Sequence, residues 1–410
     1  MKSSFPAGWA MRQLHEIAEI QTGVALGNNN HSAPEDFPYL RVANVQDGFL
    51  DLREIKTIKI DRQKAERFRL QAGDVLVTEG GDFDKLGRGY VWQGEVNPCL
   101  HQNHIFAIRP RPGVVEPYFL AAVIGSYYGR LYFLSCAKKS TNLASINSTE
   151  LKRMLIPLPR LEEQRAISNM VGLWEGAERD LACLIEAKRT LKVGLMQTLL
   201  KESQSPASNG WREYKLKELF TERNETNRTD LPLLSITNDR GVVPRTEIDR
   251  RDSSSEDKAA YKRIAPGDIG YNTMRMWQGV SGLSDIEGIV SPAYTVCTPH
   301  ERVNGKFAAY LFKFAPAIHL FHRYSQGLVD DTLSLKFPNF GEIKLSVPSI
   351  EQQQRIASIL TAVDTEMNLL HAFRDELRSQ RKALTEQVLR SSVSVEKLCA
   401  LPGCRARVSR

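Results

Sequence analysis

The chain has 410 residues, of which 42% are hydrophobic and 25% are charged, and its formal net charge is +7. This length allows two or three domains, and this composition is typical of a globular protein rather than of a disordered chain. The positive surplus suits a polyanionic partner, although many proteins carry such a charge only for solubility.

No targeting or membrane signal is evident in the sequence. The N-terminus, MKSSFPAGWAMRQL, lacks the apolar core of a signal peptide. The most apolar run, residues 118–134, is too short and too often interrupted by glycine, serine and arginine to span a membrane. The six cysteines form no CxxC pair, which indicates free thiols in a reducing compartment. We therefore expect a cytoplasmic protein.

Residues 1–157 predict a first domain of mixed α/β structure. A short helical pattern follows Trp9, and turn signals then separate several β-branched or aromatic runs. These runs predict strands at residues 39–42, 55–60, 74–78, 89–92, 104–108 and 153–158. Residues 116–134 predict a helix or a pair of helices.

Residues 158–201 predict one long helix that begins at Pro159, because proline fits the first turn of a helix but not its interior. Apolar residues recur along it at alternating spacings of three and four, which is the heptad pattern of a helix that packs against another helix. The predicted seam residues are Ile167, Met170, Trp174, Leu181, Leu184 and Leu191. A helix that packs only on its own domain remains the alternative.

The same order of events then restarts. Residues 202–210, ESQSPASNG, predict a linker, and residues 211–346 predict a second domain. In that domain Trp211 matches Trp9, Gly267-Asp268 matches Gly73-Asp74, and Phe307 matches Phe119.

A second long helix is predicted at residues 347–390, and its Pro348 aligns with Pro159 at an offset of 189 residues (348 − 159) without a gap. Its predicted seam residues are Ile356, Ile359, Val363, Leu370, Phe373 and Leu377. A repeat of this length indicates two similar halves rather than a solenoid. Residues 391–410 predict a basic tail that ends in Arg405, Arg407 and Arg410.

These patterns predict an α+β chain in which two mixed α/β domains form a pseudo-twofold repeat joined by the two long helices. Both helices share one heptad phase, so each can bury its seam against the other in an antiparallel coiled coil. Some 34 helical residues at about 1.5 Å each give a rod of about 50 Å.

The sequence carries no recognisable catalytic motif. It lacks a G-x-x-x-x-G-K-[ST] phosphate loop, the [DNS]-P-P-[YFW] tetrapeptide of amino-methyltransferases, and the G-x-S-x-G and H-E-x-x-H motifs. Chance or an ordinary solvated loop explains the other candidates best, which are Glu54-Ile55-Lys56, Glu342-Ile343-Lys344, Cys99 with His101 and His104, and Glu79 with Asp82 and Asp84. We therefore expect no catalytic residue and no metal or cofactor site in this chain.

The remaining chemistry is that of recognition. Arg and Lys suit guanine, Asn and Gln suit adenine, and lysines and hydroxyls suit phosphates. Polar, basic loops of both domains carry such side chains, and the expected contacts with double-stranded DNA are Lys85, Arg88, Gln102, Asn103, Lys139, Asn142, Arg240, Asn272, Arg275 and Gln278. Each alone is more often a solvated loop residue, but the set on a basic, repeated scaffold favours DNA.

The phrase that begins each long helix is more specific. Residues 156–167 read IPLPRLEEQRAI, and residues 345–356 read LSVPSIEQQQRI. With the helices that follow, these phrases resemble the two conserved regions of the specificity subunit of type I restriction–modification enzymes, and the resemblance extends over essentially the whole chain. One departure is Ser349, where the family favours a second proline or a similar residue.

The resemblance implies a function and a set of partners. In that family each variable domain is a target recognition domain that reads one half of a split DNA site, and the two helices set the spacer between the halves. Two methyltransferase subunits dock on the specificity subunit, and motor–nuclease subunits join them. S-adenosylmethionine, ATP and Mg belong to those partners, so the resemblance implies a non-catalytic subunit of an adenine-DNA methyltransferase and restriction endonuclease.

Two other classes of protein remain open. A stand-alone two-headed DNA-binding repressor or scaffold would need neither an exposed LEEQ entry to the first helix nor a docking face on the helices, and co-purification of a methyltransferase subunit discriminates against it. A self-contained methyltransferase is disfavoured by the absent motifs, and binding of adenosylmethionine by the isolated chain would revive it.

Overall fold

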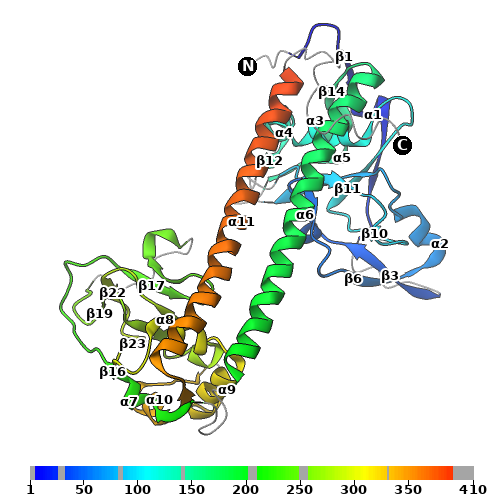
Figure 1. The fold of residues 1–410 in the computed structure, drawn as a ribbon. Coiled ribbons are helices and arrows are strands. Elements are labelled where there is room, and N and C mark those ends of the chain that lie inside the picture. The colour runs from blue at the N-terminus through cyan, green and yellow to red at the C-terminus, as the bar shows by residue number, and fades with distance from the viewer. Residues whose placement is uncertain are drawn as a thin grey trace. The chain divides into compact units, whose positions relative to one another are not determined.

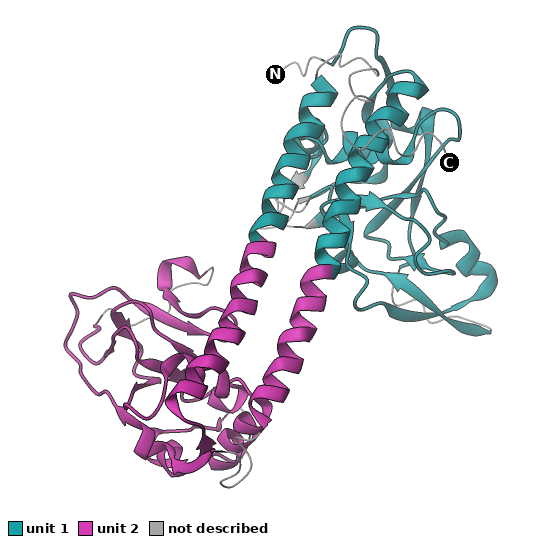
Figure 2. Ribbon diagram, in the orientation of Figure 1, with its two compact units in different colours: residues 1–183, 372–410 teal, residues 184–371 magenta. Residues whose placement is uncertain are grey.

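The computed structural model describes residues 5–25, 33–81, 86–139, 144–201, 210–248, 257–329 and 332–390. Two compact units make up the chain (Figure 2): unit 1 comprises Met1–Cys183 and Ala372–Arg410, and unit 2 comprises Leu184–His371. Each unit joins one mixed α/β domain to parts of the two long helices, α6 (Leu161–Leu199) and α11 (Ile350–Arg390), as Figure 1 shows. The predicted fold class is confirmed.

A four-stranded antiparallel sheet lies at the centre of each domain, and the strand order is the same in both. In unit 1 the order is β2 (Ala18–Thr22), β11 (Ile105–Pro110), β7 (Val75–Thr78) and β9 (Gly89–Val91). In unit 2 it is β16 (Phe220–Glu222), β23 (Tyr294–Pro299), β20 (Ile269–Asn272) and β21 (Ser281–Leu283). The sequence repeat is therefore also a repeat of topology.

The first and last strands of each domain pair with each other and so bring its two ends together. β1 (Ala10–Gln13) pairs antiparallel with β14 (Leu155–Leu158), and β15 (Arg212–Lys215) pairs antiparallel with β24 (Lys344–Val347). The strand predicted at residues 153–158 is shorter than expected, because Asn147 Oδ1 accepts a hydrogen bond from Glu150 N (2.8 Å) and caps a helix that takes residue 153.

Short helices also follow in the same order in the two units. They are α1 (Leu14–Ile17), α3 (Pro117–Gly125), α4 (Tyr127–Cys136) and α5 (Ser148–Arg153) in unit 1, and α7 (Leu216–Leu219), α8 (Gly305–Leu311), α9 (Ala315–Tyr324) and α10 (Phe337–Glu342) in unit 2. The matched tryptophans have matched partners: Trp9 lies 5.9 Å from the ring of Phe119, and Trp211 lies 6.1 Å from that of Phe307. In the described parts of the chain, no helix has both the length and the apolar character to cross a bilayer.

The other elements differ between the units. Unit 1 adds β3 (Pro34–Leu40), β4 (Val45–Gln46), β5 (Phe49–Leu50), β6 (Lys56–Asp61), β8 (Gly80–Gly81), β10 (Leu100–His101), β12 (Lys138–Lys139), β13 (Ala144–Ser145), α2 (Arg62–Ala65), η1 (Val42–Asn44) and η2 (Glu66–Phe68). Unit 2 adds β17 (Leu234–Thr237), β18 (Gly241–Pro244), β19 (Lys262–Ile264), β22 (Gly288–Val290), η4 (Arg245–Glu247) and η5 (Met276–Gln278). A shared frame therefore carries different insertions.

The matched Gly-Asp pairs make the same turn before the central strands β7 and β20. Gly73 (φ +96°) and Gly267 (φ +92°) adopt the left-handed conformation that glycine tolerates best. Asp74 and Asp268 follow them and are each 1% exposed. Each carboxylate accepts a backbone N–H of its own turn and pairs with an arginine, Arg109 at 2.8 Å in unit 1 and Arg223 at 2.7 Å in unit 2. These aspartates stabilise the frame.

Candidate nucleic-acid interface

In unit 2, three of the predicted DNA contacts lie on one loop, Asn272–Gln278, which we call the reading loop. Asn272 Oδ1 accepts a hydrogen bond from Met274 N (3.0 Å), so this side chain shapes the loop at its start. Trp277 anchors the other end, because its indole Nε1 donates to Met274 O (3.0 Å) and its ring packs edge-on against His322 of α9 at 5.9 Å. The loop is therefore braced from within and from the neighbouring helix.

The braced loop presents two side chains that suit base recognition. Arg275 and Gln278 are both exposed, and Arg275 Nη1 lies 3.4 Å from Gln278 Oε1. A guanidinium can donate two hydrogen bonds to a guanine edge, and a carboxamide can pair similarly with adenine. The structure thus brings together the residues that the sequence predicts here, whereas Asn272 serves the loop itself.

The other predicted residue of unit 2, Arg240, lies in the turn between β17 and β18. Its backbone N–H donates to Thr237 Oγ1 (3.0 Å), and its guanidinium is ion-paired with Glu247. Lys313 ties the same turn down, since its Nζ donates to Asn238 O (2.8 Å) and Oδ1 (3.0 Å), and burial lowers the pKa of this lysine to about 8. To contact DNA, the guanidinium of Arg240 would therefore have to leave its ion pair with Glu247.

In unit 1, Gln102 and Asn103 follow β10 and are half-buried. Their backbone N–H groups donate to Leu40 O and Val24 O, both at 2.9 Å. Arg88 is also half-buried and donates from Nη1 to Gln46 Oε1 at 3.2 Å. These three side chains are thus less available than those of the reading loop.

The topology gathers the remaining predicted segments of unit 1 around β8. Lys139 of β12 pairs with Ala144 of β13, and Ala144 pairs with Gly81 of β8, which leads toward Lys85. Lys85 and Asn142 themselves fall in segments that the structure does not describe, and of Lys139 only the backbone is described. The three-stranded sheet of β12, β13 and β8 therefore adjoins the segments in which the sequence predicts DNA contacts.

The residues that the sequence offers as metal ligands do not form one site. Cys99 and His101 are buried; burial raises the pKa of the Cys99 thiol to about 12 and lowers that of His101 to about 4. His104 Nδ1 instead lies 2.7 Å from Glu79 Oε2. Within the described ranges, no group of three or more His, Cys, Asp or Glu side chains could hold a metal ion.

Within each unit one end of α6 packs beside the opposite end of α11. In unit 1, Ile167 and Met170 of α6 share a core with Val388 and Leu389 of α11. In unit 2, Leu360 of α11 shares a core with Leu200 and with α6 residues at its C-terminal end. The same cores hold residues of the α/β domains, so each helix end packs both on a domain and on the other helix.

The predicted seam is corrected at four positions. Leu184, Leu191, Ile359 and Phe373 are 43%, 47%, 36% and 58% exposed, so the heptad seam does not continue through them. An α-helix turns once per 3.6 residues, and a strict 3.5-residue pattern drifts away from its buried face. The buried face of α6 accordingly passes from Leu181 to Ile185 rather than to Leu184.

Ion pairs join the two long helices within each unit. Lys188 pairs with Glu366 and Lys192 with Asp364 in unit 2, at 2.8 and 2.6 Å. In unit 1, Arg378 and Arg381 of α11 pair with Glu178 of α6 at 3.2 and 2.9 Å. The periodicity of apolar residues cannot predict such ion pairs. The four-residue spacing that places Lys188 and Lys192 on one face of the helix is, however, visible in the sequence.

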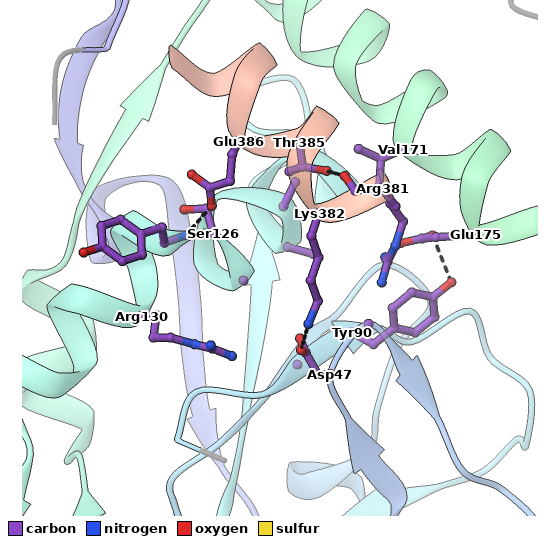
Figure 3. A pocket seen from close by; sticks show the side chains of 16 residues that line it. Asp47, Tyr90, Ser126, Arg130, Val171, Glu175, Arg381, Lys382, Thr385 and Glu386 are labelled. Carbon is purple, nitrogen blue, oxygen red and sulfur yellow. Dashed lines mark hydrogen bonds and ion pairs between the residues drawn. The ribbon is translucent and has the colours of Figure 1, made fainter. Parts of the chain in front are cut away.

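An acid and a base recur at matched positions of the two units, and in each unit the acid also accepts a hydrogen bond from a tyrosine that has no counterpart in the other unit. In unit 1 (Figure 3), Tyr90 donates to Glu175 Oε2 (3.0 Å), and Arg381 Nη1 lies 3.4 Å from Glu175 Oε1. In unit 2, Tyr310 donates to Asp364 Oδ2 (2.7 Å), and Lys192 Nζ pairs with Asp364 Oδ1 (2.6 Å). Glu175 and Asp364 are 189 positions apart, as are Lys192 and Arg381.

The unit 1 cluster lines a cavity of about 190 Å³ between the domain and the two helices (Figure 3). Lys382 closes one side through an ion pair with Asp47 (2.6 Å), and Glu386 accepts a hydrogen bond from Tyr127 N. Burial raises the pKa of Glu175 to about 7, an effect larger than the opposing influence of Arg381. The carboxyl therefore titrates near neutral pH inside the helix pairing.

The glutamine of each repeated phrase is a buried clamp. Gln164 is 1% exposed and donates from Nε2 to Pro159 O (3.0 Å) and Val114 O (3.2 Å), while its Oε1 accepts from Glu116 N (2.9 Å). Gln353 is 0% exposed and repeats this pattern with Pro348 O, Arg302 O and Asn304 N at 2.8, 3.0 and 2.8 Å. The glutamine of the LEEQ phrase is therefore buried rather than exposed as expected.

A duplicated α/β frame with different loop insertions and a shared helix pair defines a two-headed recognition protein. The family model described as the type I restriction modification DNA specificity domain matches the chain twice, at residues 6–171 and 208–378. These matches span most of its length, so the chain belongs to the type I restriction–modification DNA specificity family.

Some related proteins align with nearly the whole chain, and others align with only a part of it. The putative type I restriction enzyme MjaX specificity subunit of Methanocaldococcus jannaschii is 23% identical over 421 residues, covering 95% of each chain. The EcoKI specificity subunit of Escherichia coli is 24% identical over 160 residues, covering 38% of this chain and 33% of that one.

Solved structures show the same fold. The type I restriction–modification S subunit from M. genitalium has a TM-score of 0.54 at 17% identity, covering 95% of this chain and 98% of that one. A chain from a study of the assembly and conformational transition of the type I R-M system has a TM-score of 0.55 at 17% identity, covering 94% and 97%.

Proposed function

We propose that this chain is the DNA recognition subunit of a type I restriction–modification complex, in which each domain reads one half of a bipartite double-stranded target. The observation that carries the proposal is the pair of DNA specificity domains on one repeated frame. The exposed Arg275 and Gln278 supply base-reading chemistry in unit 2. In unit 1 the predicted contacts nearest β8 in sequence, Lys85 and Lys139, would supply the corresponding chemistry.

The chemistry of the complex belongs to partner subunits in this proposal. Two methyltransferase subunits bind S-adenosylmethionine and dock on this chain, and motor–nuclease subunits bind ATP and Mg. Exposed apolar side chains on the long helices support such docking, among them Leu184, Leu191, Leu369 (66% exposed) and Phe373. The isolated chain should accordingly show no methyl transfer, nuclease or ATPase turnover.

Methylome mapping tests the proposal. Cells that carry this gene with its partner genes are compared by long-read sequencing with cells that carry only the partner genes. We expect adenine methylation at one split motif in the first cells and none of that motif in the second. Methylation that does not depend on this chain, or turnover by the pure chain alone, would contradict the proposal and favour a repressor or a self-contained enzyme.

A further inference from the structure

Unit 2 carries two exposed apolar residues at the end of one turn, Leu328 and Val329, which we call the apolar tip and to which the proposed function assigns no role. Leu328 is 100% exposed, the highest value among the exposed large hydrophobic side chains of the described residues, and its neighbour Val329 is 61% exposed. Removing a leucine side chain from water is worth roughly 1.5–3 kcal/mol, so this tip has much to gain from a partner surface.

Hydrogen bonds hold the turn that carries this tip. At its base, Gln326 and Ser334 exchange two backbone hydrogen bonds of 2.9 and 2.8 Å. Near its end, Thr332 donates from both N and Oγ1 to Val329 O, each at 2.9 Å. Gly327 has φ +150°, and a Cβ there would lie 2.6 Å from Thr332 O, so the turn requires glycine. Backbone hydrogen bonds therefore hold the base of the turn and Val329 beside Leu328.

Both sides of the turn adjoin the reading loop. Leu335, which follows its base, donates from N to Thr273 O of the reading loop at 2.8 Å. On the other side, His322 near the end of α9 packs against Trp277 of the same loop. The turn that carries the apolar tip therefore adjoins the loop that carries the exposed Arg275.

The charges around the tip suit nucleic acid. Exposed cations lie on all three segments of this surface, namely Arg275, Arg323 and Lys336. The reading loop, α9 and the described part of the turn contain no acidic side chain. Asp330 and Asp331 lie outside the described residues. The described part of this surface is therefore basic, which suits contact with DNA.

We propose that Leu328 is a groove contact, whose side chain enters a DNA groove at the half-site read by unit 2 and is buried against base edges. Leucine and similar side chains contact thymine methyl groups in the major groove or insert between base steps in the minor groove. This inference rests on the proposed function and names a residue that no hydrogen-bonding pattern would select.

The full chain, co-expressed with its methyltransferase subunits, is tested on a duplex that carries the motif methylated by the same complex. Leu328→Asn should lower the affinity about 10-fold or more, because the burial of one leucine is lost. The slope of log affinity against log salt should stay the same, because no phosphate contact is removed. Ile286→Asn, at a 37% exposed position of the same unit, is the matched control and should change nothing.

Proximity is measured independently of affinity. A benzophenone amino acid at position 328 should crosslink the duplex on irradiation, and the same group at position 286 should not. Unchanged affinity of Leu328→Asn, or crosslinking of position 328 to a protein subunit instead of DNA, overturns the groove contact. A wild-type complex that neither binds nor methylates any duplex refutes the proposed function itself, so the two failures are distinguishable.

Discussion

Arg275 is the residue of unit 2 for which the structure makes the clearest DNA prediction. Its guanidinium is exposed and directed by a loop that Trp277 braces, so a base contact requires little reorganisation. Arg275→Ala should cost about 1–3 kcal/mol of specific binding and relax one position of one half-site. Sequencing of duplexes selected from a randomised pool measures both effects.

The exposed Arg323 of the same unit serves as the comparison. A contact with phosphate carries no sequence information, so Arg323→Ala should at most weaken all sequences alike and reduce the salt dependence. An Arg275→Ala complex that selects the wild-type motif unchanged would remove Arg275 from the set of base-reading residues.

Glu175 makes the stability of unit 1 depend on pH. Burial raises its pKa from 4.5 to about 7, so the folded protein keeps a proton that the unfolded chain has lost. Folding takes up a proton between these two values, and the stability contribution therefore falls as pH rises from about 4.5 to about 7 and is level above that. Glu175→Gln should flatten this dependence, which thermal unfolding from pH 4.5 to 8 measures.

Glu162 lies on the same helix and is exposed, so Glu162→Gln should keep the wild-type pH profile. Identical profiles for the wild-type protein and Glu175→Gln would show that Arg381 compensates the buried carboxylate and that the pKa of Glu175 is ordinary.

At the scale of the elements, Gln164 and Gln353 fix where each long helix begins. Each amide satisfies two carbonyl groups and one N–H group of the preceding segments. Gln353→Ala leaves these groups buried without a partner and should lower the free energy of unfolding of unit 2 by about 2–3 kcal/mol. Chemical denaturation measures the change.

A neighbouring glutamine provides the control, because Gln354 is exposed on the same helical turn. Gln354→Ala should stay within about 0.5 kcal/mol of the wild-type protein. Gln353→Glu keeps an acceptor for Asn304 N but replaces the donor to Pro348 O and Arg302 O by an oxygen, so it should destabilise unit 2 at least as much as Gln353→Ala. Equal stability of Gln353→Ala and Gln354→Ala would reject the clamp.

The repeated phrase was recognisable in the sequence, but the role of its glutamine was not. Position and periodicity place Gln164 near a helix start, whereas its partners Val114 and Glu116 lie about 50 residues earlier and meet it only in the folded domain. The seam prediction was wrong at four positions for a related reason. Counting apolar residues cannot place the ammonium of Lys192 against Asp364, a pair that takes the position of an apolar contact.

The apolar residues that the helix pairing leaves exposed predict a docking face. Leu184→Asn and Leu191→Asn should leave the thermal stability of the chain unchanged, because both side chains are already in contact with water. Co-purification of methyltransferase subunits with the tagged double variant should fall. Leu155→Asn, at a 43% exposed position in β14, should leave co-purification intact. Undiminished co-purification of the double variant would place docking elsewhere.

At the scale of the whole molecule, the duplication was predictable and the insertions were not. The anchors, such as Trp9 with Trp211 and Asp74 with Asp268, recur because the frame that they stabilise recurs. The strands of the insertions pair differently in the two units, so no position in one predicts a contact in the other. Most of the predicted DNA contacts fall in or next to these insertions, where the sequence cannot show which side chains are half-buried or serve their own loop.

The last prediction concerns the spacing of the two half-sites. Helix α6 runs without a break over 39 residues, a length of about 58 Å, and DNA completes one turn in about 34 Å. If the helices set the spacer, an insertion of four residues near Lys201 adds about 6 Å to α6 and should lengthen the spacer by about two base pairs without changing either half-site. Exchange of residues 1–157 for another such domain should instead change one half-site and keep the spacer. Helices that only cap their own domains predict the wild-type spacer in both variants, and methylome mapping decides between these outcomes.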